Sequence, residues 1–235
     1  MPFTISHAIV AYPVHHLTRR KIRVMPVVIG SLSPDFPYLL LMTPVHAPGH
    51  SVPGVLIYCL LPALLILALW YRWLEKPILN LLALPRAQIS FNTRDVLLII
   101  LGVLIGAYSH VLWDVTSHAY GYFVHNSDFW HSEVFGLPLY KLNQYGSGIL
   151  GLSGLVFWYA KLKEKSLEVT ELPHIKMACV IYTCSILFFV LAANLLHDAA
   201  GLSYIAVRSA IGFINGIIIG SVIYAFCVRW KSLTF

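Results

Sequence analysis

The sequence predicts an all-α fold, a polytopic transmembrane helical bundle of about five to six spans. Hydrophobic residues make up 58% of the 235 residues and charged residues only 11%, whereas a soluble domain usually carries about 25% charged residues. The mean hydropathy is +0.76. Because a transmembrane helix needs roughly 20 mostly apolar residues, this length has room for about five or six such helices and little besides.

Six apolar segments account for about half of the chain. Five of them are expected to cross the membrane, although the third is short: 55–74, 96–113, 146–159, 177–196 and 205–227. The sixth, 24–44, is long enough to cross, but it contains Pro26, Pro34, Pro37 and Asp35. Proline removes an amide donor and kinks a helix, and a carboxylate in lipid is costly unless it faces protein or water. This segment therefore either crosses as a bent helix or re-enters the membrane.

The formal net charge is +6, but the Lys and Arg residues lie in short clusters that flank apolar runs. This placement is typical of the positive-inside rule, so we expect no nucleic-acid partner. If 24–44 crosses, nearly all of these cations share one side, and the loops around His50 and 114–144 lie outside the cytoplasm. If 24–44 re-enters, the amino terminus joins the outer face and the basic cluster at 19–23 breaks the rule.

The domain organisation predicted from this pattern is simple. Residues 1–235 form one integral membrane domain, with interfacial or re-entrant segments at 1–53 and a transmembrane bundle at 54–229 that includes a polar loop at 114–145. The four cysteines lie in apolar stretches without C-x-x-C spacing, which indicates small core residues. Aromatic residues near the span ends, Trp113 among them, are interpreted as an aromatic belt.

The strongest pattern for chemistry is His110-x3-Asp114-x3-His118, at the end of the second predicted span. Residues four apart lie on one face of a helix, so at least two of these side chains can reach one ion. Imidazole and carboxylate ligands suit zinc, iron or manganese. A hydrogen-bonded polar stripe at the membrane surface explains the same spacing, because H-x3-D occurs by chance in many helices.

Further ionisable side chains lie near the apolar segments: His7, Asp35 and the pair His46-x3-His50. Singly, a histidine near a membrane interface is usually an amphipathic side chain with satisfied contacts. Together they indicate a functional site, because ionisable groups within membrane segments are rare. The sequence contains no G-x-S-x-G, Walker loop or G-x-G-x-x-G, so nucleotide hydrolysis and a lipase-type serine triad have no support.

Several ordered motifs resemble a known family. They are the opening MPFTISHA, the run GSLSPDFPYLL, the pair His50–Ser51 before an apolar span, the run GAYSHVLWDVTSHAYGYFV and the later LYKLNQYGSGILG. They resemble the bacterial integral membrane family called domain of unknown function 4184, over most of the chain and most densely in its first two-thirds. The resemblance implies a multi-pass protein of the bacterial cell (inner) membrane, and it implies no particular activity.

More distantly, an amino-terminal His, a P-D pair and S-H-x3-D at a helix end resemble membrane-bound proteins described as metal-dependent hydrolases. Their ligand sets are similar to those of zinc-dependent phospholipase C. This resemblance implies a divalent metal, with zinc favoured, and the following ligands: His7, Asp35, His50, His110 and Asp114. The chain lacks the further His and Glu ligands of a three-zinc site, so a one- or two-metal site, or a degenerate one, is implied.

Two functional hypotheses follow from different classes of protein. The first is a metal-dependent hydrolase that acts on a lipid or phosphoester at the membrane surface, with Asp114 and His118 as catalytic residues and the lipid bilayer and a lipid-linked substrate as partners. The second is a non-enzymatic membrane protein, either a small transporter with a relay through Asp35 and His110 or a structural partner of another complex. Metal content and transport in proteoliposomes discriminate between the two.

Overall fold

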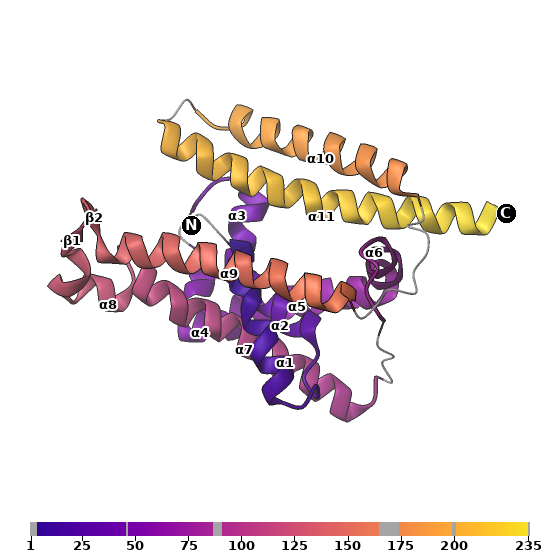
Figure 1. The fold of residues 1–235 in the computed structure, drawn as a ribbon, viewed down its shortest axis with the longest axis horizontal. Coiled ribbons are helices and arrows are strands. Elements are labelled where there is room, and N and C mark those ends of the chain that lie inside the picture. Colours follow the sequence, from indigo (N-terminus) through magenta and orange to yellow (C-terminus); the bar gives the residue numbers. More distant parts are fainter. Residues whose placement is uncertain (1–3, 46, 87–90, 165–173, 199–200, 235) are drawn as a thin grey trace. The chain divides into compact units, whose positions relative to one another are not determined.

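The computed structural model of the chain describes residues 4–45, 47–86, 91–164, 174–198 and 201–234 (Figure 1). These residues are mostly helical, with one short hairpin of two-residue strands, which confirms the predicted all-α fold. The chain divides into two compact units. The first comprises Met1–Phe36, His46–Leu65 and Ser90–Trp158, and the second comprises Pro37–Val45, Ile66–Ile89 and Tyr159–Phe235. Every predicted site residue belongs to the first unit.

The first unit is built around the long helix α7 (Thr93–Ser117), which begins where the Asn92 side chain accepts a hydrogen bond from the Asp95 amide at 2.9 Å. The elements before it are the 3-10 helix Thr4–Val10, α1 (Ala11–Leu17), α2 (Val24–Leu32), the 3-10 helices Ser33–Asp35 and Pro48–His50, α4 (Val52–Gly54) and the π-helix Val55–Cys59. After α7 come α8 (Tyr122–His125), the 3-10 helix Asp128–His131, β1 (Glu133–Val134) and β2 (Leu137–Pro138). Three helices continue from this unit into the second: α3 (Phe36–Leu41), α5 (Leu60–Leu69) and α9 (Leu139–Glu164).

The proline-containing segment forms α2, a 3-10 turn and α3 in succession, and not one regular helix. Pro26, Pro34 and Pro37 each lie in the first turn of one of these three elements. The amides of a first turn have no partner within their own helix, so proline is tolerated there. The regular α-helix is therefore interrupted at the 3-10 turn, and this is where Asp35 lies.

Helix α2 packs against α7 through glycine. A Cβ atom at Gly106 would lie 2.7 Å from the backbone nitrogen of Ser31, and one at Gly30 would lie 2.7 Å from the Cα of Val103. No side chain fits such a gap, so the two backbones come into direct contact, as small residues permit in membrane helices. This close approach brings the end of α2 beside the middle of α7.

A hairpin precedes α9, and the π-helix Val55–Cys59 is another neighbour of α7. The π-helix packs against it through a buried cluster of Val55, Cys59, Ala107 and Val111. The hairpin β1–β2 turns through Phe135 (φ 55°) and Gly136 (φ 74°), the left-handed pair that a two-residue hairpin favours. Because α9 begins directly after this hairpin, the loop predicted to reach residue 145 ends at Pro138, and its last residues are helical.

The second unit contains the π-helix Trp70–Leu74, α6 (Glu75–Leu81), α10 (Ile175–Leu195) and α11 (Leu202–Thr234). Helices α10 and α11 lie side by side (Figure 1). Gly212 of α11 contacts the α10 backbone, since a Cβ there would lie 2.7 Å from the Cα of Val190. One buried hydrophobic cluster of this unit consists of Leu74, Ile78, Ala178, Tyr224 and Ala225.

Within the described residues, five helical segments are long and apolar enough to cross a membrane: Val24–Leu41, Val52–Leu81, Thr93–His125, Ile175–Leu195 and Leu202–Trp230. The number agrees with the predicted five to six spans, and the proline-interrupted segment is one of them. The predicted span 146–159 is helical, but its helix α9 is not among the five. Glycine, serine and the flanking lysines Lys161 and Lys163 lower its hydropathy.

Candidate metal centre

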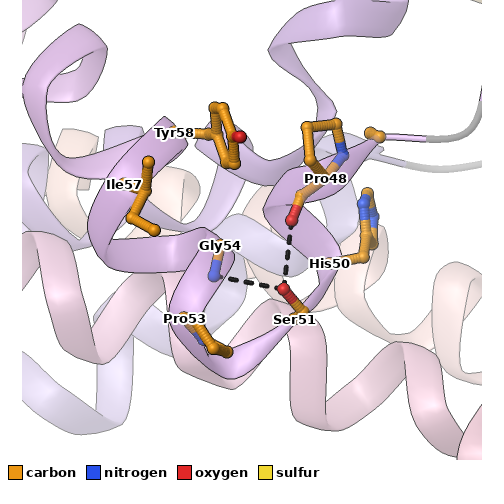
Figure 2. A pocket seen from close by; sticks show the side chains of 8 residues that line it. Pro48, His50, Ser51, Pro53, Gly54, Ile57 and Tyr58 are labelled. Carbon is orange, nitrogen blue, oxygen red and sulfur yellow. Dashed lines mark hydrogen bonds between the residues drawn. The ribbon is translucent and has the colours of Figure 1, made fainter.

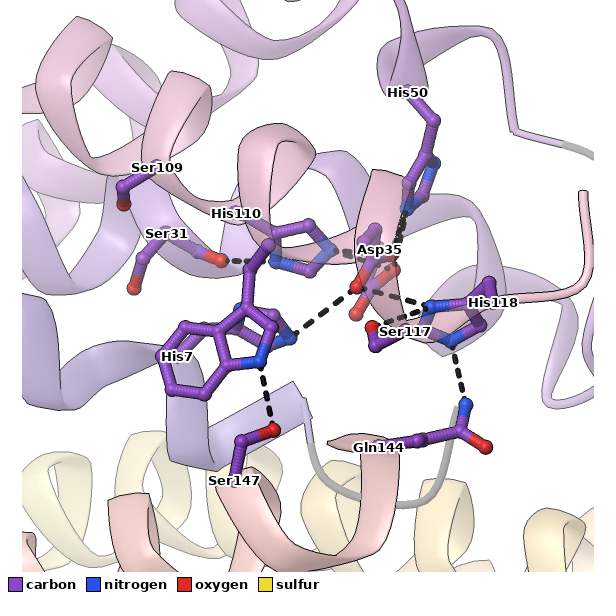
Figure 3. A network of polar contacts seen from close by, with 12 residues as sticks. His7, Ser31, Asp35, His50, Ser109, His110, Ser117, His118, Gln144 and Ser147 are labelled. Atoms are coloured by element: carbon purple, nitrogen blue, oxygen red, sulfur yellow. Dashed lines mark hydrogen bonds and ion pairs between the residues drawn. The ribbon is translucent and has the colours of Figure 1, made fainter. Parts of the chain in front are cut away.

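The five residues implied as metal ligands come together in the first unit, although they are spread over more than 100 positions of the sequence (Figure 3). Helix α7 carries His110 and Asp114 one turn apart on the face that packs against α2. His7, Asp35 and His50 each come from a separate 3-10 helix. The spacing argument therefore holds within α7, and the chain fold supplies the other three side chains.

Asp114 occupies the middle of this cluster. Its Oδ1 atom lies 3.6 Å from His7 Nε2 and 3.3 Å from His118 Nδ1. Its Oδ2 atom lies 3.3 Å from both His50 Nε2 and His110 Nε2. One carboxylate thus faces four imidazole rings, two with each oxygen.

Asp35 faces the same space from the 3-10 turn. Its Oδ1 atom lies 3.2 Å from His50 Nε2 and 3.6 Å from His110 Nε2. The side chains of Asp35 and His110 are completely buried, and Asp114 is 4% exposed. In the part of the chain that the structure describes, neither oxygen of Asp35 or Asp114 has a hydrogen-bond donor. Buried carboxylates without donors are costly unless a cation lies beside them.

The orientation of His110 follows from its hydrogen bond to α2. Its Nδ1 atom lies 2.7 Å from the carbonyl oxygen of Ser31, and because a carbonyl can only accept, Nδ1 carries a proton. In the neutral ring Nε2 therefore presents a lone pair, and this lone pair faces the carboxylates of Asp35 and Asp114. Either a second proton on the ring or a metal ion between these atoms relieves the repulsion. A histidine that donates one nitrogen to a carbonyl and leaves the other for an ion is the usual arrangement of metal-binding histidines.

His7 lies against His110. The two rings stack with their centroids 3.9 Å apart, and the ring of Trp113 contacts His7 edge-on at 4.9 Å. Burial, with a contribution from His110, lowers the pKa of His7 well below its ordinary value. His7 is consequently neutral at pH 7, the state in which an imidazole binds a metal.

His50 differs from His7 in its electrostatics. Burial lowers its pKa, but the adjacent carboxylates of Asp114 and Asp35 outweigh burial and raise the pKa to about 9. Without a metal, His50 therefore carries a proton at pH 7 and partly neutralises the two carboxylates. An ion that binds here has to displace that proton.

Two overlapping sets of side chains can each hold an ion: His7 with His110 and Asp114, and Asp35 with His50 and His110. Within each set the ligand atoms all lie within 4.8 Å of one another. The donors are imidazole nitrogens and carboxylate oxygens, which suit zinc, iron and manganese. His118, the remaining residue of the α7 pattern, contacts Asp114 but belongs to neither set.

A cavity of about 340 Å³ lies next to His50 (Figure 2). Apart from His50 and Ser51 its walls are mainly apolar, and they include Pro53, Ile57 and Tyr58. Ile57 and Tyr58 are 65% and 54% exposed on a segment apolar enough to cross the membrane. The Ser51 side chain accepts a hydrogen bond from the Gly54 amide at 3.1 Å and so starts the helix that forms this wall.

Some residues of the site were not predicted. Trp113 was assigned to the aromatic belt, yet it contacts His7 and donates from Nε1 to the Ser147 hydroxyl at 2.9 Å. The Ser31 carbonyl and the Gln144 side chain, which lies 2.9 Å from His118, also had no signal in the sequence. A backbone carbonyl leaves no trace in residue identity, and Gln144 lies 26 positions from its partner.

The fold and the site define a class: all-α membrane proteins with a buried cluster of histidines and aspartates. Within it, the chain belongs to the family described as Domain of unknown function (DUF4184), whose model matches residues 1–226. This match confirms the family that the sequence motifs resemble. Comparison with curated proteins and with solved structures found no match. The more distant resemblance to membrane-bound hydrolases gains no support from these comparisons.

Proposed function

We propose that this protein is a metal-dependent hydrolase that acts on a lipid or a lipid-linked phosphoester at the membrane surface. The proposed ligands are His7, Asp35, His50, His110 and Asp114, and zinc is the favoured ion. Asp114 and His118 are the proposed catalytic residues. A divalent ion in such a site lowers the pKa of a bound water to about 7 and polarises a phosphoryl or acyl oxygen.

One observation carries this proposal: Nε2 of His110 faces the buried carboxylates of Asp35 and Asp114, at 3.6 and 3.3 Å, and none of the four carboxylate oxygens has a hydrogen bond in the described chain. With neutral imidazoles the cluster has a formal charge of −2, which a divalent cation cancels. A polar packing stripe would instead pair each buried oxygen with a donor, as nearly all buried polar groups are paired.

The residues around the ligands support hydrolysis more than storage of an ion. His118 is buried and lies 3.3 Å from Asp114, so it is positioned to hold a proton beside the site without occupying a ligand position. The cavity beside His50 offers an apolar wall to a substrate, and its exposed residues Ile57 and Tyr58 belong to an apolar helical segment. A lipid that enters sideways from the bilayer fits this arrangement.

We also propose a location. The five apolar helical segments make the chain a membrane protein. In bacteria, helical multi-pass proteins lie in the inner membrane, whereas outer-membrane proteins are mostly β-barrels. The bacterial cell (inner) membrane is therefore the proposed site of action, and a lipid or lipid-linked phosphate is available there.

The test begins with elemental analysis of protein purified in detergent from metal-replete cells. We expect stoichiometric zinc, manganese or iron in the wild type and in His125→Ala, which changes an exposed histidine outside the cluster. We expect no metal in His110→Ala or Asp114→Ala. The metal-loaded protein is then assayed with phospholipids and lipid-linked phosphates, and hydrolysis should disappear in the same two variants.

The opposite result would point to the second class of function. Protein that contains no metal after purification, but that moves protons or ions in proteoliposomes and loses this transport in Asp35→Asn, is a transporter with a His/Asp relay. Metal binding without hydrolysis of any lipid ester or phosphoester would limit the site to a structural role.

A further inference from the structure

A chain of polar contacts leads from the start of α9 to Asp114, and Figure 3 shows its link between Gln144 and His118. Lys141 Nζ lies 3.1 Å from Gln144 Oε1. Gln144 Nε2 lies 2.9 Å from His118 Nε2. On its other side, His118 Nδ1 lies 3.0 Å from the Ser117 hydroxyl and 3.3 Å from Asp114 Oδ1.

The positions of the protons in this chain follow from what each group can do. An ammonium group can only donate, so Gln144 accepts with its oxygen and turns its NH₂ group toward His118. That NH₂ group can also only donate, so His118 Nε2 must accept and therefore carries no proton. The single proton of the His118 ring lies on Nδ1, where it faces Ser117 and Asp114.

We propose that Gln144 and Lys141 are positioning residues that fix the proton of His118 on Nδ1, beside Asp114, and so keep this ring out of the metal's ligand set. The Nδ1 atom is the only ring nitrogen of His118 that reaches the cluster. With a proton on it, that atom cannot bind an ion. It instead places a proton near Asp114 Oδ1, 3.3 Å from Nδ1, and leaves Asp114 Oδ2 for the ion.

The surroundings of α9 hold this chain in place. Asn143 Nδ2 donates to the Thr116 carbonyl at 3.0 Å, and Ser147 accepts from Trp113 Nε1 at 2.9 Å. Gln144 lies between these two contacts and is 7% exposed. Helix α9 contributes no proposed ligand, yet it controls the state of a side chain that contacts one.

The position of the His118 proton does not depend on the proposed metal site, but its effect on metal affinity does. The two are therefore measured separately. The first readout is ¹⁵N NMR of labelled histidine in metal-free protein, with His118→Gln to assign the signal. We expect the wild-type His118 ring to carry its proton on Nδ1. In Gln144→Glu the new carboxylate can only accept, so a proton should appear on Nε2. Asn126→Asp, the same change at an exposed amide, should leave the His118 signal unaltered.

The second readout is metal affinity. Gln144→Glu should weaken binding by about 10- to 100-fold, the usual effect of disturbing a side chain that contacts a metal ligand, here His118 beside Asp114. Lys141→Met should weaken binding in the same direction because it frees the Gln144 amide to rotate, and Lys141→Arg, which keeps a donor, should restore most of the affinity.

Two results would overturn the inference: a wild-type His118 with its proton on Nε2, or a Gln144→Glu variant with an unchanged His118 signal and unchanged affinity. If the proton moves as expected but no variant, nor the wild type, binds metal, the positioning chain stands and the proposed metal function fails. The NMR measurement needs no ion, so these two outcomes are distinguishable.

Discussion

The substitution Asp114→Asn is the most informative single change, because Asp114 faces four imidazoles while Asp35 faces two. It keeps the shape of the side chain and removes one of the two negative charges in the cluster. A carboxylate and a unit positive charge about 3.3 Å apart attract by about 5 kcal/mol at an effective dielectric constant of about 20. If half of this energy is lost, metal affinity falls by about 100-fold.

This loss converts into a measurable shift in thermal stability. Metal at about 100 times its Kd stabilises the wild type by about 2.7 kcal/mol. For a chain of this length each kcal/mol raises Tm by about 2–4 °C, so the wild type should gain about 5–11 °C. In Asp114→Asn the same metal concentration equals the new Kd, stabilisation falls to about 0.4 kcal/mol, and the gain should be about 1–2 °C.

The assay is thermal unfolding of detergent-purified protein, followed by tryptophan fluorescence after treatment with a chelator and again after addition of zinc, manganese or iron. The matched control is Asp128→Asn, which changes an exposed aspartate on the 3-10 helix Asp128–His131 and should behave as the wild type. Equal shifts in wild type and Asp114→Asn would refute the reasoning, and so would the absence of a shift with every metal.

Three further predictions concern the same cluster. Because the pKa of His50 is raised to about 9 without metal, metal displaces its proton, and calorimetric affinity should rise about 100-fold from pH 6 to pH 8; a flat profile contradicts this. His7→Gln should release metal on dialysis while His125→Gln retains it, since His7 faces Asp114 and His125 is exposed outside the cluster. Gly106→Ala should lower stability by about 1–3 kcal/mol in a denaturant titration and also weaken metal binding, because overpacking separates α2 from α7. Gly146→Ala, which has open space around it, should do neither.

The fold was predictable to the extent that composition and hydropathy decide it. Low charge and long apolar runs were sufficient for the all-α prediction and for the number of spans. They did not correctly predict 146–159 as a span, because the glycines and serines of this helix make it less apolar than the five segments that are long and apolar enough to cross. The end of the polar loop was also misplaced, because helix start signals are weak where a hairpin leads directly into a helix at Leu139.

The site was predictable in its residues more than in its geometry. Spacing alone placed His110 and Asp114 on one face of a helix, and the structure has them there. The rarity of ionisable groups in membrane segments marked His7, Asp35 and His50 as part of a functional site, but only a resemblance made them ligands of the same ion, because no periodicity connects segments so far apart in sequence. The hydrogen-bond partners that decide protonation, the Ser31 carbonyl and the Gln144 amide, depend on helix packing and had no pattern to reveal them.

The way the cluster is assembled explains why an interrupted helix is useful here. Two candidate ligands lie on α7, a rigid helix of 25 residues, and three lie on 3-10 turns of three to seven residues. In a continuous α-helix through residues 24–41, each side chain would be rotated from the last by the same angle. The 3-10 turn at Ser33–Asp35 has fewer residues per turn, so it changes this rotation close to the point where α2 contacts His110. The prolines that interrupt the span are thus compatible with a segment that both crosses the membrane and supplies Asp35 to the cluster. They sit in first turns, where the missing amide costs little, and they leave Asp35 at the interruption, buried against protein and away from lipid.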